Sequence, residues 1–131
     1  MSGNSPPIGK RFWAIAEGYI PPDSTGGDDR RFLSHETACL LNAGDTTAHI
    51  EFTLYFSDRG PVGPYRVTVE PRRTRHVRFN DFIDPAPVPR DTDYACTIVS
   101  DVPIVVQHTR LDSRQAALAL MTTVAYAAPI E

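Results

Sequence analysis

The chain has 131 residues, of which 41% are hydrophobic and 22% are charged, and its formal net charge is −3. This length and balance are typical of one globular domain, and they exclude a disordered polypeptide, a second sizeable core and a protein that is basic throughout. The apolar runs fall short of the ~20 residues that a membrane-spanning helix needs. The opening ten residues carry no apolar signal segment. We therefore expect a soluble protein of the cytoplasm.

The chain divides into one domain with short ends. Residues 1–9 are small, polar and rich in proline and glycine, which predicts a flexible arm. We expect one folded domain over residues 10–127 and a flexible end at residues 128–131. Cys39 and Cys96 lie in apolar stretches, and in a cytoplasmic protein they are expected to be buried and free rather than joined.

The first half of the chain shows three strand-like segments. KRFWAIAEG (10–18) and FLSHETACLLN (32–42) predict two of them, and the polar PPDSTGGDDRR (21–31) between them predicts a loop. The third, over residues 49–56, has the clearest period of two and predicts a half-buried strand. Its apolar face consists of Ile50, Phe52, Leu54 and Phe56.

The middle of the chain continues as strands and turns. Residues 58–64 predict a turn, after which residues 65–69 form the second arm of a hairpin. RTRHVRFN (73–80) predicts another strand, with Phe79 on the same face as Val77. The three prolines of DPAPVPRDTD (84–93) require a loop.

Three further strands complete the predicted fold. Two are expected at residues 94–100 and 103–111, separated by residues 101–102, and the tail ALALMTTVAYA (117–127) favours a third. One face of the second is expected to carry Ile104, Val106, His108 and Arg110. Short strands at this spacing predict an all-β fold, a single-domain antiparallel β-sandwich of jelly-roll type.

No catalytic motif is present in the sequence. The chain has no G-x-S-x-G elbow, no P-loop and no H-E-x-x-H zinc motif. Its four histidines lack the close spacing of metal ligands, so structural hydrogen bonds are their favoured role. We therefore expect no enzymatic activity, no catalytic residue, no metal and no cofactor.

Several charged side chains interrupt apolar strand segments. Glu17 follows FWAIA, Glu36 precedes ACLL, and Arg110 lies beyond PIVV. Burying such groups is costly unless each finds a partner. One interpretation, favoured from the residues alone, is internal pairing of Arg110 with one of these acids or with Asp112. The other is a pocket for a small polar ligand, with Trp13 stacking on it.

A basic segment spans residues 66–78 and contains a single acid, Glu70. Its arginines are Arg66, Arg72, Arg73, Arg75 and Arg78. Arginine suits phosphate, so this face is a candidate for DNA binding, although interleaved aromatics and a recognised motif are missing. Pairing with the acidic segments 28–29 and 91–93 across a subunit interface is the favoured interpretation.

Six strings of the chain are long and unusual. They are FWAIAEGYIPP (12–22), SHETACLLNAGD (34–45), FSDRGPVGPYRVTV (56–69), RRTRHVRFND (72–81), DPAPVPRDTDYA (84–95) and VPIVVQHTRLDSRQ (102–115). In these strings the sequence resembles the soluble sensory rhodopsin transducer family, from about Lys10 to Ala127. The resemblance implies a β-sandwich that assembles into a homotetramer, with a mobile C-terminal end.

The resemblance also implies a domain that binds small molecules, such as a sugar or a related metabolite. The polar signature residues of the family match here at Trp13, Glu17, His35, Glu36, Asn42, His76, Arg78, Asn80, His108, Arg110 and Asp112. We expect a non-enzymatic transducer that passes on a signal by docking to a membrane rhodopsin-like receptor and being released. Binding of a sugar or polar metabolite is the alternative, and DNA binding through residues 66–78 is the third.

Overall fold

The computed structural model describes residues 8–24, 29–114 and 119–129, which form eight strands and two short 3₁₀ helices. The strands are β1 (Lys10–Gly18), β2 (His35–Asn42), β3 (Ala48–Phe56), β4 (Val62–Val69), β5 (Arg73–Arg78), β6 (Tyr94–Asp112), β7 (Ala119–Val124) and β8 (Tyr126–Ala127). The helices are η1 (Arg30–Phe32) and η2 (Phe79–Asp81).

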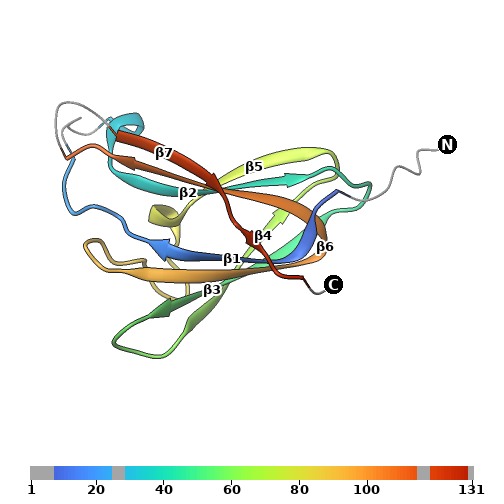
Figure 1. Cartoon of the computed structure of the whole chain (residues 1–131), viewed down its shortest axis with the longest axis horizontal. Helices are drawn as coiled ribbons and strands as arrows, with labels where there is room; N and C mark the ends of the chain where they lie inside the picture. Colours follow the sequence, from blue (N-terminus) through green and yellow to red (C-terminus); the bar gives the residue numbers. More distant parts are fainter. Residues whose placement is uncertain (1–7, 25–28, 115–118, 130–131) are drawn as a thin grey trace.

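The strands form two facing layers that share β6 (Figure 1). Layer A has the strand order β4-β3-β6-β1-β8, and layer B has the order β5-β2-β6-β7. Every strand pair is antiparallel. The predicted all-β antiparallel sandwich is therefore confirmed.

Strand β6 corrects the sequence prediction, which placed two strands here with a break at residues 101–102. The structure has a single strand of 19 residues. Residues up to Ser100 pair with β1 and β3 of layer A, and Ile104 pairs once more with Lys10 of β1. Residues from Val105 pair with β2 of layer B. At the crossing, the Ser100 hydroxyl accepts the backbone N–H of Val102 at 3.3 Å, and Pro103 has no N–H to satisfy. The turn-forming residues thus bend the strand from one layer into the other without ending it.

Strand β4 begins earlier than the sequence predicted. Gly63 and Pro64, assigned to a turn, lie inside it. Because β4 is at the edge of layer A, a proline that donates no hydrogen bond is tolerated there. The predicted hairpin of β3 and β4 is present, with Ile50 paired to Val67 and Phe52 to Tyr65.

Phe79 also departs from the prediction, because it starts η2 and does not extend β5. Its ring is fully buried and lies edge-on to Phe52, with centroids 5.8 Å apart, and tilted on Tyr94 at 5.4 Å. Fully burying a large apolar side chain of this kind contributes about 1.5–3 kcal/mol. This burial favours a chain that turns inward after Arg78 over one that continues along the sheet edge.

The two cysteines are free, as expected, and only Cys96 is fully buried, while Cys39 is half-buried. Burial raises the pKa of the Cys96 thiol to about 12. The predicted flexible arm (1–9) and flexible end (128–131) fall largely outside the described residues. None of the helices in the described part of the chain has the length and apolarity to span a membrane.

Candidate functional site

A buried carboxylate, Glu36 of β2, is the centre of the candidate site. Strand register places Glu36 directly beside Arg110 of β6, and period-two alternation turns both side chains and that of His108 toward the core. The His108 ring Nε2 lies 3.0 Å from Glu36 Oε1. Arg110 Nε donates to Glu36 Oε2 in a short ion pair. The interpretation of internal pairing is correct for Glu36, whereas Asp112 pairs with Arg114 instead of Arg110.

Tyr94 completes the cluster, and sequence reasoning did not single it out. Its hydroxyl donates to Glu36 Oε1 at 2.8 Å. Gly18 of β1 pairs with Tyr94, and a Cβ atom on Gly18 would lie 2.4 Å from the tyrosine ring. The glycine therefore makes room for the ring. The sequence alone offered no signal for Tyr94, because its position opposite Gly18 follows from the strand register.

The charges of this cluster are set by their neighbours. Burial alone would raise the pKa of Glu36, but hydrogen bonds from His108 and Arg110 outweigh burial and hold the pKa below its ordinary value. Burial and the adjacent carboxylate raise the pKa of Tyr94 far above its ordinary range. Glu36 is thus an ionised acceptor whose oxygens are already engaged, which suits binding and positioning better than proton transfer.

One donor of the cluster has no partner. Arg110 Nη2 is buried and makes no hydrogen bond among the described residues. Burying an unsatisfied donor costs about 1–3 kcal/mol. A ligand oxygen at this atom would remove that cost, so the guanidinium marks a position that favours a carbonyl, hydroxyl or anionic oxygen.

A hollow of about 190 Å³ between β1 and β7 leads to the cluster. His108 and Glu17 are its polar walls, and Ile15, Met121 and Val124 are among its apolar ones. The volume is below the ~300–1,000 Å³ of drug-sized sites. It brings Glu17 to the same hollow as His108, as the sequence set suggested.

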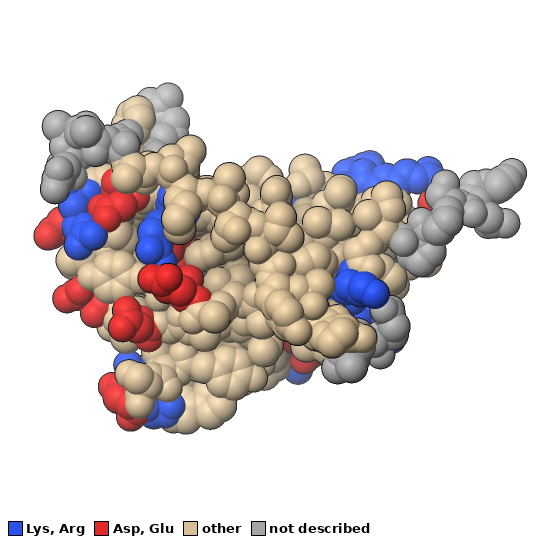
Figure 2. Space-filling model, in the orientation of Figure 1, with Lys and Arg blue, Asp and Glu red and all other residues tan. Residues whose placement is uncertain are grey.

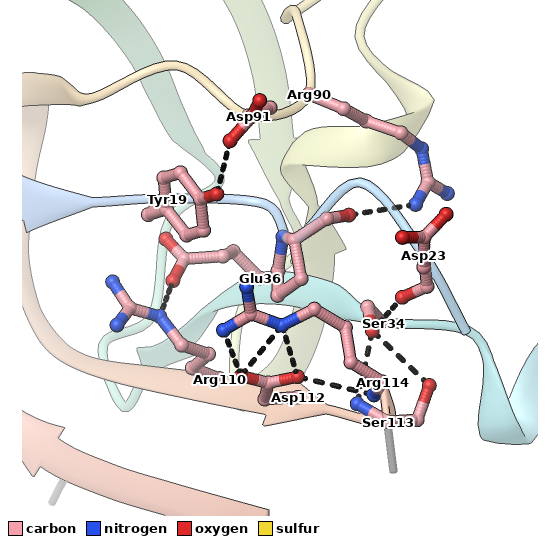
Figure 3. A network of polar contacts seen from close by, with 11 residues as sticks. Tyr19, Asp23, Ser34, Glu36, Arg90, Asp91, Arg110, Asp112, Ser113 and Arg114 are labelled. Carbon is pink, nitrogen blue, oxygen red and sulfur yellow. Dashed lines mark hydrogen bonds and ion pairs between the residues drawn. The ribbon is translucent and has the colours of Figure 1, made fainter. Parts of the chain in front are cut away.

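A rim of ion pairs and hydrogen bonds surrounds the end of β6 (Figure 3). Arg114 Nη2 lies 2.6 Å from the Asp112 carboxylate, and its guanidinium stands 5.9 Å from the ring centre of Tyr19. The Tyr19 hydroxyl in turn donates to Asp91. Asp112 therefore belongs to the rim and not to the buried cluster.

Asn80 and Ser34 hold Glu36 in place. The Asn80 side-chain oxygen accepts the backbone N–H of Glu36 at 3.2 Å, and its amide donates to the Ser34 carbonyl at 3.1 Å. The Ser34 hydroxyl accepts the backbone N–H of Ser113 at 2.9 Å. These contacts join the start of β2 to η2 and to the end of β6.

Two predicted ligand residues are placed elsewhere. Trp13 is buried in the core, and its indole N–H donates to the Lys10 carbonyl at 2.9 Å. Asn42 is also buried, and its amide donates to the carbonyls of Thr46 at 2.8 Å and Val69 at 3.0 Å. Neither side chain takes part in the hydrogen bonds of Glu36. Asn42 instead stabilises the turn after β2.

The remaining predicted residues, His35, His76 and Arg78, face a second hollow on the outer side of layer B. Strand alternation puts it on the opposite face of β2 from Glu36, so the sequence set describes two separate places.

The other arginines of segment 66–78 make contacts within the chain. Arg66 pairs with Glu51 at 3.0 Å, and Arg72 pairs with Asp45 at 2.6 Å. Neither acid belongs to the acidic segments that the sequence suggested as partners. The described residues contain no group of three or more histidine, cysteine or carboxylate side chains arranged for a metal ion.

The family model described as Anabaena sensory rhodopsin transducer matches residues 8–127. The chain belongs to this family. A solved structure named Anabaena sensory rhodopsin transducer is 61% identical, covers 80% of this chain and all of its own, and superposes with a TM-score of 0.69. A crystal structure of a Thermotoga maritima protein is 36% identical, covers 92% of this chain and 96% of its own, and has a TM-score of 0.79. A comparison with curated proteins gave no match.

The family assignment made from the sequence strings is confirmed by this match. The matched range closely follows the expected domain, residues 10–127.

Proposed function

We propose that this protein is a non-enzymatic signal transducer of the cytoplasm that docks to a membrane sensory rhodopsin and is released when the receptor changes state. The observation that carries the proposal is the family match over residues 8–127, together with 61% identity to a structure named as a transducer. A transducer needs a surface that a partner can cover and uncover.

The edge strands β7 and β8 offer such a surface. Large apolar side chains are exposed there, with Leu120 71%, Met121 50%, Val124 61% and Tyr126 64% accessible. Figure 2 shows acidic and basic side chains gathered at the left end and further basic ones at the right end, while the central face between them is largely uncharged. Contiguous exposed apolar side chains on an edge strand favour association with a partner. We propose this edge as the docking surface for the receptor.

Binding to membranes that contain a sensory rhodopsin tests the proposal. The protein should co-sediment with receptor-containing vesicles, and illumination should change the bound fraction. Val124→Lys should abolish binding, whereas Ile83→Lys, at a residue 73% exposed outside these strands, should leave it intact. Absence of binding in both light and dark would contradict the transducer role. Equal loss of vesicle binding in Val124→Lys and Ile83→Lys would contradict the proposed docking surface but not the transducer role.

The homotetramer implied by the family is part of the same proposal. Light scattering on the purified protein measures it directly, and a monomeric mass would contradict it.

A second candidate function is the binding of a small polar metabolite such as a sugar at Glu36, His108 and Arg110. Two observations support it: Arg110 Nη2 is buried without a hydrogen bond among the described residues, and a hollow of about 190 Å³ reaches His108. A thermal-shift screen of sugars and polar metabolites should find a stabilising compound.

Arg110→Ala and His108→Ala should abolish the thermal shift. Since both residues also support Glu36, Glu17→Gln is the matched variant, because Glu17 is exposed and lines the same hollow. If Glu17→Gln loses the ligand-induced thermal shift while its melting temperature without ligand is unchanged, the result supports a pocket. If Glu17→Gln keeps the whole ligand-induced shift and the other two variants unfold, the cluster is only structural.

A further inference from the structure

We propose that the hollow on the outer face of layer B is a binding site for a phosphate group. It has a volume of about 340 Å³ and is lined by Arg30, His35, Thr37, Cys39, His76, Arg78, Asp81 and Thr109. The site lies on the opposite face of β2 from Glu36, so this inference does not depend on the proposed transducer or metabolite functions.

The strand register assembles this hollow from three neighbouring strands. Thr37 of β2 pairs with Arg78 of β5 on one side and with Thr109 of β6 on the other. One position along, Cys39 pairs with His76. Because Ala38 and Leu40 point into the core, their neighbours on β2 point outward. Cations and hydroxyl donors from separate strands therefore converge on one concave surface.

The charges in the hollow are unbalanced. Asp81 is the acid that lines it, and it already pairs with Arg30 at 2.5 Å. Arg78 donates one hydrogen bond, to the Arg30 carbonyl at 3.0 Å, and no carboxylate lies within ion-pair distance of it in the described part of the chain. The two guanidinium groups that line the hollow thus share the single carboxylate of its lining, Asp81.

The surroundings of Arg78 and His35 report the same positive potential. Burial lowers the pKa of Arg78, and the like charge of Arg30 lowers it further, while the Asp81 carboxylate acts in the opposite direction. Burial also lowers the pKa of His35, and the charges of Arg78 and Arg30 add to this effect. The hydrogen bond to the Leu33 carbonyl and the Asp81 carboxylate oppose it, and the net shift is downward. Crowded cations of this kind are relieved by an anion and repel a metal ion.

The donor chemistry selects phosphate among anions. Guanidinium groups present planar forks of N–H donors that match phosphate oxygens, and these charge-assisted bonds are among the strongest in proteins. The hydroxyl of Thr37 can donate to a further oxygen, whereas that of Thr109 already donates to Thr122 at 3.0 Å. A neutral sugar would leave the charge of Arg78 uncompensated.

Titration of the full-length protein with inorganic phosphate tests the site. Calorimetry should show saturable binding, and the imidazole resonances of His35 and His76 should shift during the titration. Arg78→Gln should weaken binding by roughly tenfold or more, since it removes a charge-assisted donor. Arg73→Gln is the matched control, because it removes the same charge from the same strand outside the hollow and should leave affinity within about twofold.

Two further measurements keep the test decisive. His76→Gln, at an exposed residue whose side chain makes no hydrogen bond among the described residues, should fold normally and weaken binding several-fold. Tighter binding of glycerol 3-phosphate than of inorganic phosphate would identify a phosphate monoester, and equal affinity would identify free phosphate. Failure to saturate at millimolar phosphate, or equal weakening by Arg73→Gln and Arg78→Gln, would overturn the proposal.

Discussion

Replacing Arg110 by methionine removes an ion-pair partner of a fully buried carboxylate. The Glu36 side chain has no exposed surface, and that of Arg110 is 18% exposed. Breaking a buried ion pair on one side costs about 3–5 kcal/mol, because the other charge stays buried. His108 and Tyr94 still face Glu36 Oε1. We therefore expect the free energy of unfolding to fall by about 3 kcal/mol, the lower end of that range. Glu36→Gln should cost less, about 2 kcal/mol, since Arg110 retains some access to water.

The double variant Glu36→Gln/Arg110→Met tests whether the direct interaction of Glu36 with Arg110 causes these losses of stability. Hydrogen bonds between charged groups contribute about 1.5–3 kcal/mol. The loss of unfolding free energy in the double variant should therefore be smaller than the sum of the two single losses by about that amount. Urea unfolding at a fixed protein concentration measures each free energy. Fluorescence of Trp13, the single tryptophan and 6% exposed in the fold, reports the transition. Losses that add within about 0.5 kcal/mol would refute a direct interaction.

Three further changes test the surroundings of the cluster. Gly18→Ala should lower the urea midpoint, because its new Cβ would lie 2.4 Å from the Tyr94 ring, whereas Gly60→Ala, with no atom within 4 Å, should not. Asn42→Ala should cost about 2 kcal/mol in urea unfolding by leaving buried carbonyls unpaired, without changing metabolite or phosphate binding. Because burial lowers the folded pKa of His35, the unfolded chain binds the proton first as pH falls through 6.5. Stability should therefore fall on acidification by at most ~1.4 kcal/mol per pH unit, and urea titrations of His35→Gln should lack that contribution.

The strand pattern was predictable wherever one face of a strand meets the core and the other meets solvent. The alternation of Ile50, Phe52 and Leu54 appears directly as buried positions of β3. The same logic failed at residues 101–102, because turn-forming residues can bend a strand as well as end it. Only the partners on both sides of β6 show that it continues, and a single sequence does not reveal those partners.

The candidate site was predictable in part for a similar reason. Glu36, His108 and Arg110 drew notice because charged residues inside apolar strands need partners. Their meeting point depended on the register of β2 against β6, which sets Glu36 opposite Arg110. Tyr94 was missed because a tyrosine at a strand start is unremarkable until Gly18 is seen facing it.

The register also links the two functions proposed for this protein. The strand that carries His108 and Arg110 pairs directly with β7, where Thr123 lies opposite His108 and Met121 opposite Arg110. Met121 and Val124 line the hollow and are also among the exposed apolar side chains of the docking edge. A metabolite in the hollow would therefore touch the strand that we propose meets the receptor. If both bind, thermodynamic linkage requires the metabolite to change receptor affinity by the same factor as the receptor changes metabolite affinity. Measuring both factors separates a coupled sensor from two independent sites, because independent sites give a factor of one in each direction.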